Sequence, residues 1–269
     1  MAKAIKKLLV NIPVLGPLGH RLSRGLRDFG RRLRNKQPAP FQFSRMHFDP
    51  ASASPGTGPE QVRVMNLLSY TKTSQSAYNG EAFPAGYHSI ELPGLSLAGQ
   101  RNPRQRIPLI PFDFRGKVVL DIGSNQGGML FALADQIRHG VGIDYDHRLV
   151  NAANKVRSHA RVPNIDFYVF DLEKEDLNLI RDFLPADKVD VVFLLAVCVW
   201  IQNWRDVVRF AASIAESMVF EANGKVEQQQ EQVDLLHTLY QKVQLLQERS
   251  VDDPLQKKRK LYWCSNNAC

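Results

Sequence analysis

The chain has 269 residues, and 44% of them are hydrophobic, which is enough for one domain of ordinary size with a real core. Its three cysteines, Cys198, Cys264 and Cys269, have neither metal-site nor CxxC spacing, which argues against a zinc module and favours a reducing compartment. No stretch approaches the ~20 apolar residues that a membrane-spanning helix needs.

The net charge of +8 comes from the beginning of the chain. Residues 1–37 hold ten Lys or Arg against Asp28 alone, so the remainder is close to neutral. The arginines recur at helical spacing between apolar residues, which predicts a basic amphipathic arm over 1–37. Such an arm suits an anionic membrane surface or nucleic-acid phosphates, and a solubilising tail is the alternative. Residues 38–60, rich in Pro, Ser, Ala and Gly, are predicted to be a linker.

The next segment, 61–111, is predicted to contain a short strand over 87–92 and a second over 95–98, with a turn at Pro93 and Gly94. Three arginines, Arg101, Arg104 and Arg106, follow the second strand. Aromatic residues with a His and several Arg suit a sugar, a phosphate or an RNA base as a ligand.

A glycine loop follows the first long apolar strand. Residues 118–128 read VVLDIGSNQGG, an apolar strand that reaches Asp121 and then a D-x-G-x-x-x-G-G loop. Gly123 allows a positive φ, and Gly127 lets the backbone approach a ligand. Dinucleotide folds use GxGxxG. An acid before the first glycine would repel a pyrophosphate and suits a ligand that carries an ammonium group. A helix is predicted over 129–137.

Two further strands end in an acid. The strand over 140–143 ends at Asp144, 23 residues beyond Asp121, a spacing that fits a ribose-binding acid at the end of a second strand. Asp144 could instead cap the helix predicted over 149–159. A third strand over 166–170 ends at Asp171.

The rest of the chain continues the alternation of strands and helices. Strands are predicted over 189–196 and 218–220, the latter ending at Glu221, with a polar helix over 227–240. Two β-like runs over 243–249 and 259–264, separated by Asp252, Asp253 and Pro254, suggest a closing hairpin. This order predicts an α/β fold with a mainly parallel sheet and helices on both faces.

The glycine loop, the spaced acids and the closing hairpin resemble the class I S-adenosylmethionine (SAM) methyltransferases over 112–269. The resemblance implies a Rossmann-like, seven-stranded sheet, parallel with a terminal antiparallel hairpin, and SAM as the cofactor. It implies that Asp144 binds the ribose and Asp171 the adenine amino group, and that 61–111 covers the cofactor or forms the acceptor pocket. The implied cofactor-binding residues are Asp121, Gly123, Ser124, Asn125, Gly127, Asp144, Tyr145, Asp171, Leu172, Val197 and Arg101.

Methylation of a hydroxyl needs a general base within hydrogen-bond reach. The candidates are His88, Glu221 and His237, with the Asp252–Asp253 pair as a further possibility. Arg101 could hold the SAM carboxylate or an anionic acceptor, or it could be a surface Arg paired with an acid. The run after the fourth strand, AVCVW over 196–200, lacks the Asn-Pro-Pro-Tyr type of signature of amino methylation, which favours oxygen.

The sequence therefore predicts an O-methyltransferase acting on a sugar or glycan intermediate, cytoplasmic or peripheral on the inner membrane. The Gly-Gln-Arg run at 99–101 resembles both methyltransferases of surface-glycan assembly and those that modify wobble uridine in tRNA. A tRNA-modifying enzyme is thus the first alternative. A SAM-fold binding protein without catalysis is the second, because no general base is unambiguous.

Overall fold

The computed structural model describes residues 85–250 and 258–266, together with Val64, 66–68, Thr71, Phe83 and Asp252. The chain divides into two compact units, 1–45 and 46–269, and all described residues belong to the second. The predictions for the basic arm 1–37 and the linker 38–60 therefore lie outside the described residues.

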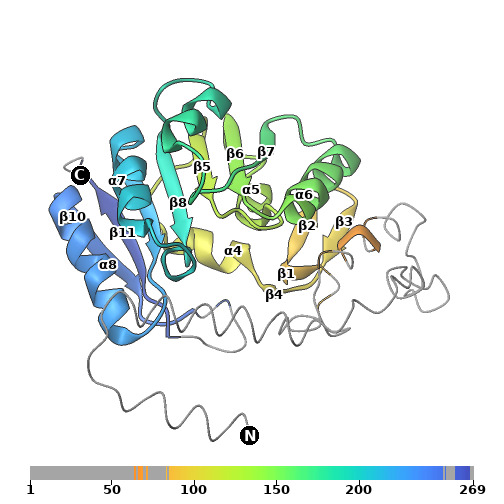
Figure 1. Cartoon of the computed structure of the whole chain (residues 1–269). Helices are drawn as coiled ribbons and strands as arrows, with labels where there is room; N and C mark the ends of the chain where they lie inside the picture. The colour runs from red at the N-terminus through yellow and green to blue at the C-terminus, as the bar shows by residue number, and fades with distance from the viewer. Residues whose placement is uncertain are drawn as a thin grey trace, which may run out of the picture. The chain divides into compact units, whose positions relative to one another are not determined.

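A seven-stranded sheet in the order β10-β11-β9-β8-β5-β6-β7 forms the centre of the described unit (Figure 1). Five neighbouring strands are parallel, and β11 runs antiparallel to both β9 and β10. This confirms the predicted methyltransferase sheet. The strands are β5 (Val118–Ile122), β6 (His139–Asp144), β7 (Ile165–Val169), β8 (Val191–Leu195), β9 (Ser217–Glu221), β10 (Lys242–Gln247) and β11 (Leu261–Ser265).

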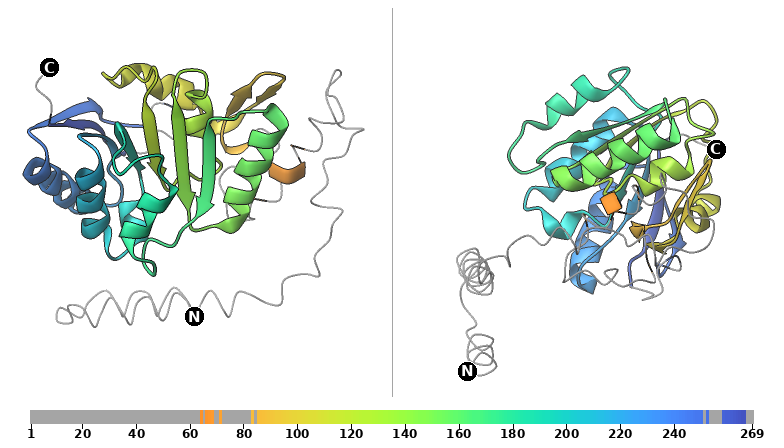
Figure 2. Two further views of the ribbon diagram at one scale, coloured as in Figure 1. Left: turned by 90° about the horizontal axis from the view of Figure 1, so that it is seen from above. Right: turned by 90° about the vertical axis from the view of Figure 1, so that its right-hand side faces the viewer.

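Helices cover both faces of this sheet, and each face has its own apolar core (Figure 2). One core joins α5 (Gly128–Ala132) and α6 (His147–Ala160) to alternate residues of the strands, such as Phe193 and Trp263. The other joins α7 (Trp204–Ile214) and α8 (Val226–Leu239) to the intervening residues, such as Leu194 and Tyr262. Strands buried on both faces are continuously apolar for this reason. The described part also contains 3-10 turns η3 (Ile107–Leu109), η4 (Leu177–Phe183) and η5 (Cys198–Trp200).

The helix after the glycine loop is shorter than the predicted 129–137. It ends at Ala132, and the chain continues as turns. Asn164 explains the difference, because its side-chain Nδ2 donates to the carbonyls of Ala134 and Ile137, at 2.9 and 2.8 Å. These carbonyls are thus satisfied by a distant side chain and need no further helical turn.

The segment before the sheet folds as four short strands, β1 (Gly86–His88), β2 (Ile90–Leu92), β3 (Leu95–Leu97) and β4 (Gly99–Arg101), followed by α4 (Pro103–Arg106). The prediction of one strand over 87–92 is wrong, because the strand breaks at Ser89. β2 and β3 form the expected hairpin, whereas β1 pairs in parallel with β4. Ser89 accepts a hydrogen bond from the Gly99 amide through its Oγ, at 2.9 Å, which supports this return.

No helix in the described part of the chain is long and apolar enough to cross a bilayer.

Candidate active site

The glycine loop lies at the carboxyl edge of the sheet, between β5 and α5. Gly123, Asn125 and Gly127 all have positive φ, at 78°, 53° and 78°. A side chain at Gly123 would lie 2.6 Å from Val197 Cγ2, and one at Gly127 would lie 2.3 Å from the Phe167 ring. The loop is therefore a tight backbone turn in which protein side chains leave no room for Cβ atoms at these two glycines, and the predicted close approach of Gly127 to a ligand stays a prediction.

Asp144, at the end of β6, fastens this loop to the second strand. Its Oδ2 accepts from the Asn125 amide and its Oδ1 from the Asp146 amide, both at 2.9 Å. Burial raises the pKa of Asp144, and the backbone hydrogen bonds from Asp146 and Asn125 oppose this effect. The cap of α6 is Asp146, which accepts from the Arg148 amide, so Asp144 is not that cap. Asp144 thus lies at the end of β6 beside the glycine loop, and its contact with the ribose stays a prediction.

Asp121 is the most strongly perturbed carboxyl at this edge. It is 2% exposed near the carboxyl end of the central strand β5, between Gly142 of β6 and Phe193 of β8. Burial, and then the nearby Asp144 carboxylate, raise the pKa of Asp121 to about 8. A carboxyl kept neutral in this way is ready to become charged when a cationic group binds next to it.

The remaining predicted cofactor residues surround the loop with different exposures. Ser124 is buried, and its Oγ has no hydrogen-bond partner within the described part of the protein. Leu172 is buried and Tyr145 is 75% exposed. Asp171 lies two residues beyond the end of β7, a correction to the predicted strand end. Its carboxylate accepts from the Glu173 amide and from Lys174 Nζ. The contacts of these residues with the cofactor stay a prediction.

Arg101 does not face the cofactor as predicted, because its guanidinium is 2% exposed and bound by two carboxylates. Nε and Nη2 donate to Asp252 at 2.9 Å, and Nη1 and Nη2 donate to Glu221 at 3.2 and 3.1 Å. Burial alone would lower the pKa of Arg101, but the charges of Glu221 and Asp252, together with Tyr87, raise it. The alternative of a surface Arg paired with an acid is thus correct in the pairing and wrong in the surface placement, because Arg101 is buried.

Arg101 belongs to a larger buried ion cluster, defined as Arg101, Arg106, Arg259, Glu221 and Asp252. Arg106 Nη2 lies 2.6 Å from Glu221 Oε2 and 3.1 Å from Asp252 Oδ2, and Arg259 Nη1 lies 3.6 Å from Glu221 Oε1. The ion cluster joins β4 and α4 to the end of β9 and to the β10–β11 connection. Glu221, a candidate base, is thus held by three guanidinium groups.

The other two candidate bases lie in different places. His88 is buried against the loop, since a Cβ on Gly128 would lie 2.3 Å from His88 Cβ, and a Cβ on Gly99 would meet the His88 backbone at 2.2 Å. Burial, and then Arg101, lower the pKa of His88 to about 3, so it is neutral at physiological pH. His237 is exposed in the last turn of α8, far along the helix from the carboxyl edge where α8 begins, so the structure does not bring it to the site.

Gln126 is a site residue that sequence reasoning missed. It is fully buried, its Nε2 donates to Thr71 Oγ1 at 2.7 Å, and its Oε1 accepts from the Tyr87 amide at 3.3 Å. Gln126 therefore ties the glycine loop to the preceding segment. The signal was a long amide side chain among small and apolar residues, where a buried polar group must find partners.

Comparisons with known proteins agree with this geometry. The N-terminal domain of EvdMO1, crystallised in the presence of SAH and D-fucose, matches 77% of this chain and 95% of its own with a TM-score of 0.53 and 13% identity. Full-length EvdMO1 matches with a TM-score of 0.50 and 16% identity over 66% of this chain and 43% of its own. At these identities the likeness concerns the fold alone.

A sequence relative comes from Drosophila melanogaster. The U6 snRNA methylphosphate capping enzyme Amus is 34% identical over 98 residues, 33% of this chain and 32% of that protein. The chain thus spans about a third of the curated relative that it matches.

The sheet order, the glycine loop and Asp144 define a class I SAM-dependent methyltransferase. A family model described as a methyltransferase domain matches residues 98–257, and the chain belongs to this family. Its cofactor is SAM, which supplies an activated methyl group when bound. The buried, unpartnered Ser124 Oγ, the close-packed glycine loop and the neutral Asp121 fit a nucleoside that carries an amino-acid group.

Replacing Asp144 by Ala is expected to weaken SAM binding by about 1–3 kcal/mol, because the loop and the ribose both lose hydrogen-bond acceptors. Isothermal titration calorimetry measures the loss. Asp146→Ala is the matched control, since it removes the α6 cap, costs about 1 kcal/mol of unfolding free energy and leaves SAM affinity nearly unchanged. Wild-type affinity in Asp144→Ala would exclude the ribose contact.

SAM affinity is expected to rise with pH between about 6 and 7.5, where the ligand amino group, with a pKa of about 8, keeps its proton. Below its pKa of about 8, Asp121 is protonated in the free protein, and a bound ammonium group favours the carboxylate. Binding therefore releases a proton, and the affinity gains at most about tenfold per pH unit. Calorimetry in buffers of different ionisation enthalpy counts this proton. The same proton release in Asp121→Asn would contradict the assignment.

Arg101→Ala is expected to lower the free energy of unfolding by about 3–5 kcal/mol, because it leaves Glu221 and Asp252 with fewer buried partners. Arg104→Ala is the control, since its pair with Glu91 is nearly half exposed and contributes at most about 1 kcal/mol. Urea unfolding of both variants compares the two losses. Equal losses would mean that the ion cluster contributes no more than a surface pair.

Proposed function

We propose that this chain transfers the methyl group of SAM to an oxygen atom of a sugar or glycan intermediate. The family supports methyl transfer, and the choice of acceptor depends on the groups at the carboxyl edge near β8 and β9. Transfer at the cytoplasmic face of a membrane is part of the proposal and depends on the arm 1–37, which is outside the described residues.

The end of β8 carries the preference for oxygen. An amino acceptor needs hydrogen-bond acceptors for its N–H groups. At the end of β8, the Ala196 carbonyl already accepts from Asn223 Nδ2 at 2.5 Å, and the Ala196 amide donates to the Glu221 carbonyl at 2.9 Å. Asn223 is itself held by Gln232, which accepts from the Asn223 amide and donates to the Asn223 carbonyl. The polar groups in this part of the edge are hydrogen-bonded to one another, so they offer few acceptors for the N–H groups of an amine.

The environment of the candidate bases indicates which kind of acceptor oxygen can be methylated. His88 has a pKa of about 3 and accepts a proton poorly. The Glu221 carboxylate is already paired with guanidinium groups of the ion cluster. A sugar hydroxyl would therefore lack a ready base on these side chains. An oxygen that is already ionised, such as that of a phosphate group on a sugar, needs no base, because the second pKa of a phosphate monoester is about 6.

A glycan acceptor has one further support. The N-terminal domain of EvdMO1, which matches 77% of this chain, was crystallised in the presence of D-fucose. In-line displacement then requires that the segment β1–β4 holds the acceptor oxygen against the methyl group and excludes water. His88, packed between Gly99 and Gly128, and Gln126 hold this segment on the glycine loop.

An RNA phosphate is the second candidate acceptor. The relative Amus is named as a methylphosphate capping enzyme of U6 snRNA, and it is 34% identical to this chain over 98 residues. A tRNA acceptor, suggested by the Gly-Gln-Arg run, stays an alternative.

The test offers purified protein and methyl-labelled SAM to a membrane glycolipid extract, total tRNA and a 5′-phosphorylated RNA oligonucleotide. The proposal predicts label in the glycolipid fraction, and prior phosphatase treatment should remove it if the acceptor is a phosphate oxygen. Label found only in either RNA would overturn the glycan acceptor. Binding of SAM without transfer to any fraction would favour a non-catalytic SAM-binding protein.

A further inference from the structure

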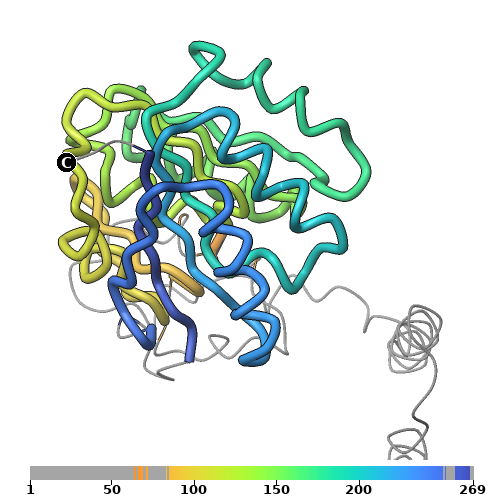
Figure 3. The backbone as a smooth tube through the Cα atoms, turned by 90° about the vertical axis from the view of Figure 1, so that its left-hand side faces the viewer, coloured from red at the N-terminus to blue at the C-terminus, as the bar shows by residue number. Residues whose placement is uncertain are grey.

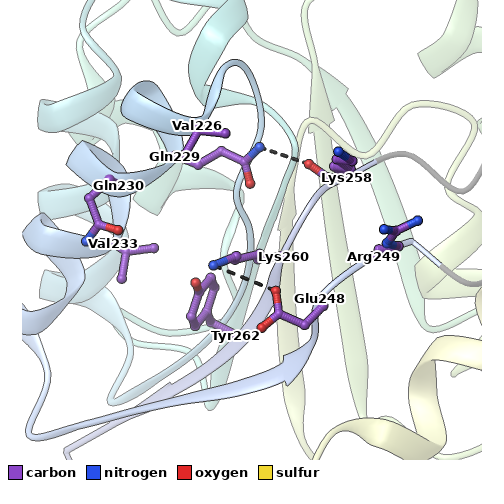
Figure 4. Close-up of a pocket in the computed structure, with 9 residues that line it drawn as sticks. All are labelled: Val226, Gln229, Gln230, Val233, Glu248, Arg249, Lys258, Lys260 and Tyr262. Atoms are coloured by element: carbon purple, nitrogen blue, oxygen red, sulfur yellow. Dashed lines mark hydrogen bonds and ion pairs between the residues drawn. The ribbon is translucent and has the colours of Figure 1, made fainter.

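A hollow lies between α8 and the β10–β11 hairpin, and no residue of the glycine loop lines it (Figure 4). This basic groove has a volume of about 500 Å³. Four α8 residues form one wall, and residues from the end of β10 and the start of β11 form the other. The backbone of α8 runs beside the β10–β11 hairpin, both in blue (Figure 3). The lining residues are Val226, Gln229, Gln230, Val233, Glu248, Arg249, Lys258, Lys260 and Tyr262.

The lining is positively charged. Arg249 and Lys258 are exposed, and Lys260 lies 3.7 Å from Glu248 in a pair whose side chains are 44% and 65% exposed. Such a pair is weak in water, and Lys260 can exchange it for a more highly charged anion. Three cationic side chains against one carboxylate give the described lining a net charge of +2.

The groove is held in place by the fold. Gln229 is buried, and its Nε2 donates to the Lys258 carbonyl at 2.9 Å and to the Gly224 carbonyl at 3.1 Å. This pair of hydrogen bonds fixes the start of the β11 strand against the first turns of α8. The lysine at 258 therefore projects from an anchored backbone.

Strand alternation connects the groove with the acceptor edge. Lys258, Lys260 and Tyr262 face α8, whereas the intervening Arg259 reaches across to Glu221 in the ion cluster. Since β10 ends and β11 begins at the carboxyl edge of the sheet, the groove opens at the same end as the candidate active site.

We propose that the basic groove binds a phosphate group of the acceptor glycan at a position other than the methylated oxygen. The inference rests on the proposed glycan acceptor. Lysine and arginine attract phosphate, and Gln230 and Glu248 can hydrogen-bond sugar hydroxyls. Tyr262, the aromatic residue of the described lining, is 7% exposed and gives no platform for stacking bases, which favours a phosphorylated glycan over single-stranded RNA.

The test measures binding of a fluorescent phosphomannopentaose to the full chain by anisotropy, with the same pentasaccharide after phosphatase treatment as the matched ligand. The wild type should bind the phosphorylated form at least tenfold more tightly. A Lys258→Glu/Lys260→Glu variant should lose this preference, and Lys155→Glu on the exposed surface of α6 should keep it. Calorimetric SAM binding checks that each variant is folded, and Lys258→Gln/Lys260→Gln replaces any variant that is not.

Equal binding of both pentasaccharides by the wild type, or an unchanged preference in the folded double variant, would overturn the proposal that the basic groove binds phosphate. Tighter binding of a five-nucleotide RNA at the same lysines would overturn the glycan as its occupant. Because binding is measured without methyl transfer, the proposal for the groove can be refuted while the glycolipid extract is still methylated. Conversely, the groove can be supported while methyl transfer to the extract fails.

Discussion

The buried ion cluster is the interaction on which the site depends most. Arg101 and Arg106 come from the segment before the sheet, whereas Glu221 ends β9 and Asp252 follows β10. Charges with so little exposure require partners, since an unpaired buried charge costs several kcal/mol. The segment β1–β4 is therefore fixed to the carboxyl edge, and His88 and Gln126 can lie against the glycine loop.

This docking explains why the glycines occur where they do. Gly127 makes room for Phe167, Gly128 for His88 and Gly123 for Val197, so the loop is enclosed by the second and third strands, the preceding segment and the end of β8. The positive φ of Gly123 and Gly127 is a local requirement of the turn, but the lack of side chains also serves these long-range contacts. The glycine loop and the segment β1–β4 thus pack as one structure.

Local pattern was sufficient to predict the sheet, because the central strands β5, β8 and β9 are largely apolar and buried and turn residues separate the strands. The spacing from Asp121 to Asp144 also fitted the observed β5–α5–β6 unit, whereas the hydrogen bond from the Asn125 amide to Asp144 was not predicted. Prediction failed where distant residues decide. Arg101 reads as a ligand-binding side chain until Asp252, 151 residues away, is placed beside it. Likewise, α5 ends early beside Asn164, which hydrogen-bonds carbonyls 27 residues or more away in the sequence. The pairing of β1 with β4 is accompanied by a hydrogen bond from the Gly99 amide to Ser89 Oγ.

The central claim is that the glycine loop and Asp144 form a binding site for the SAM nucleoside in the folded chain. Calorimetric titration with S-adenosylhomocysteine tests it most directly, because binding is read without knowledge of the acceptor. The account predicts saturable binding at one site per chain. The absence of binding at millimolar ligand, by protein whose circular dichroism shows the α/β fold, would contradict it.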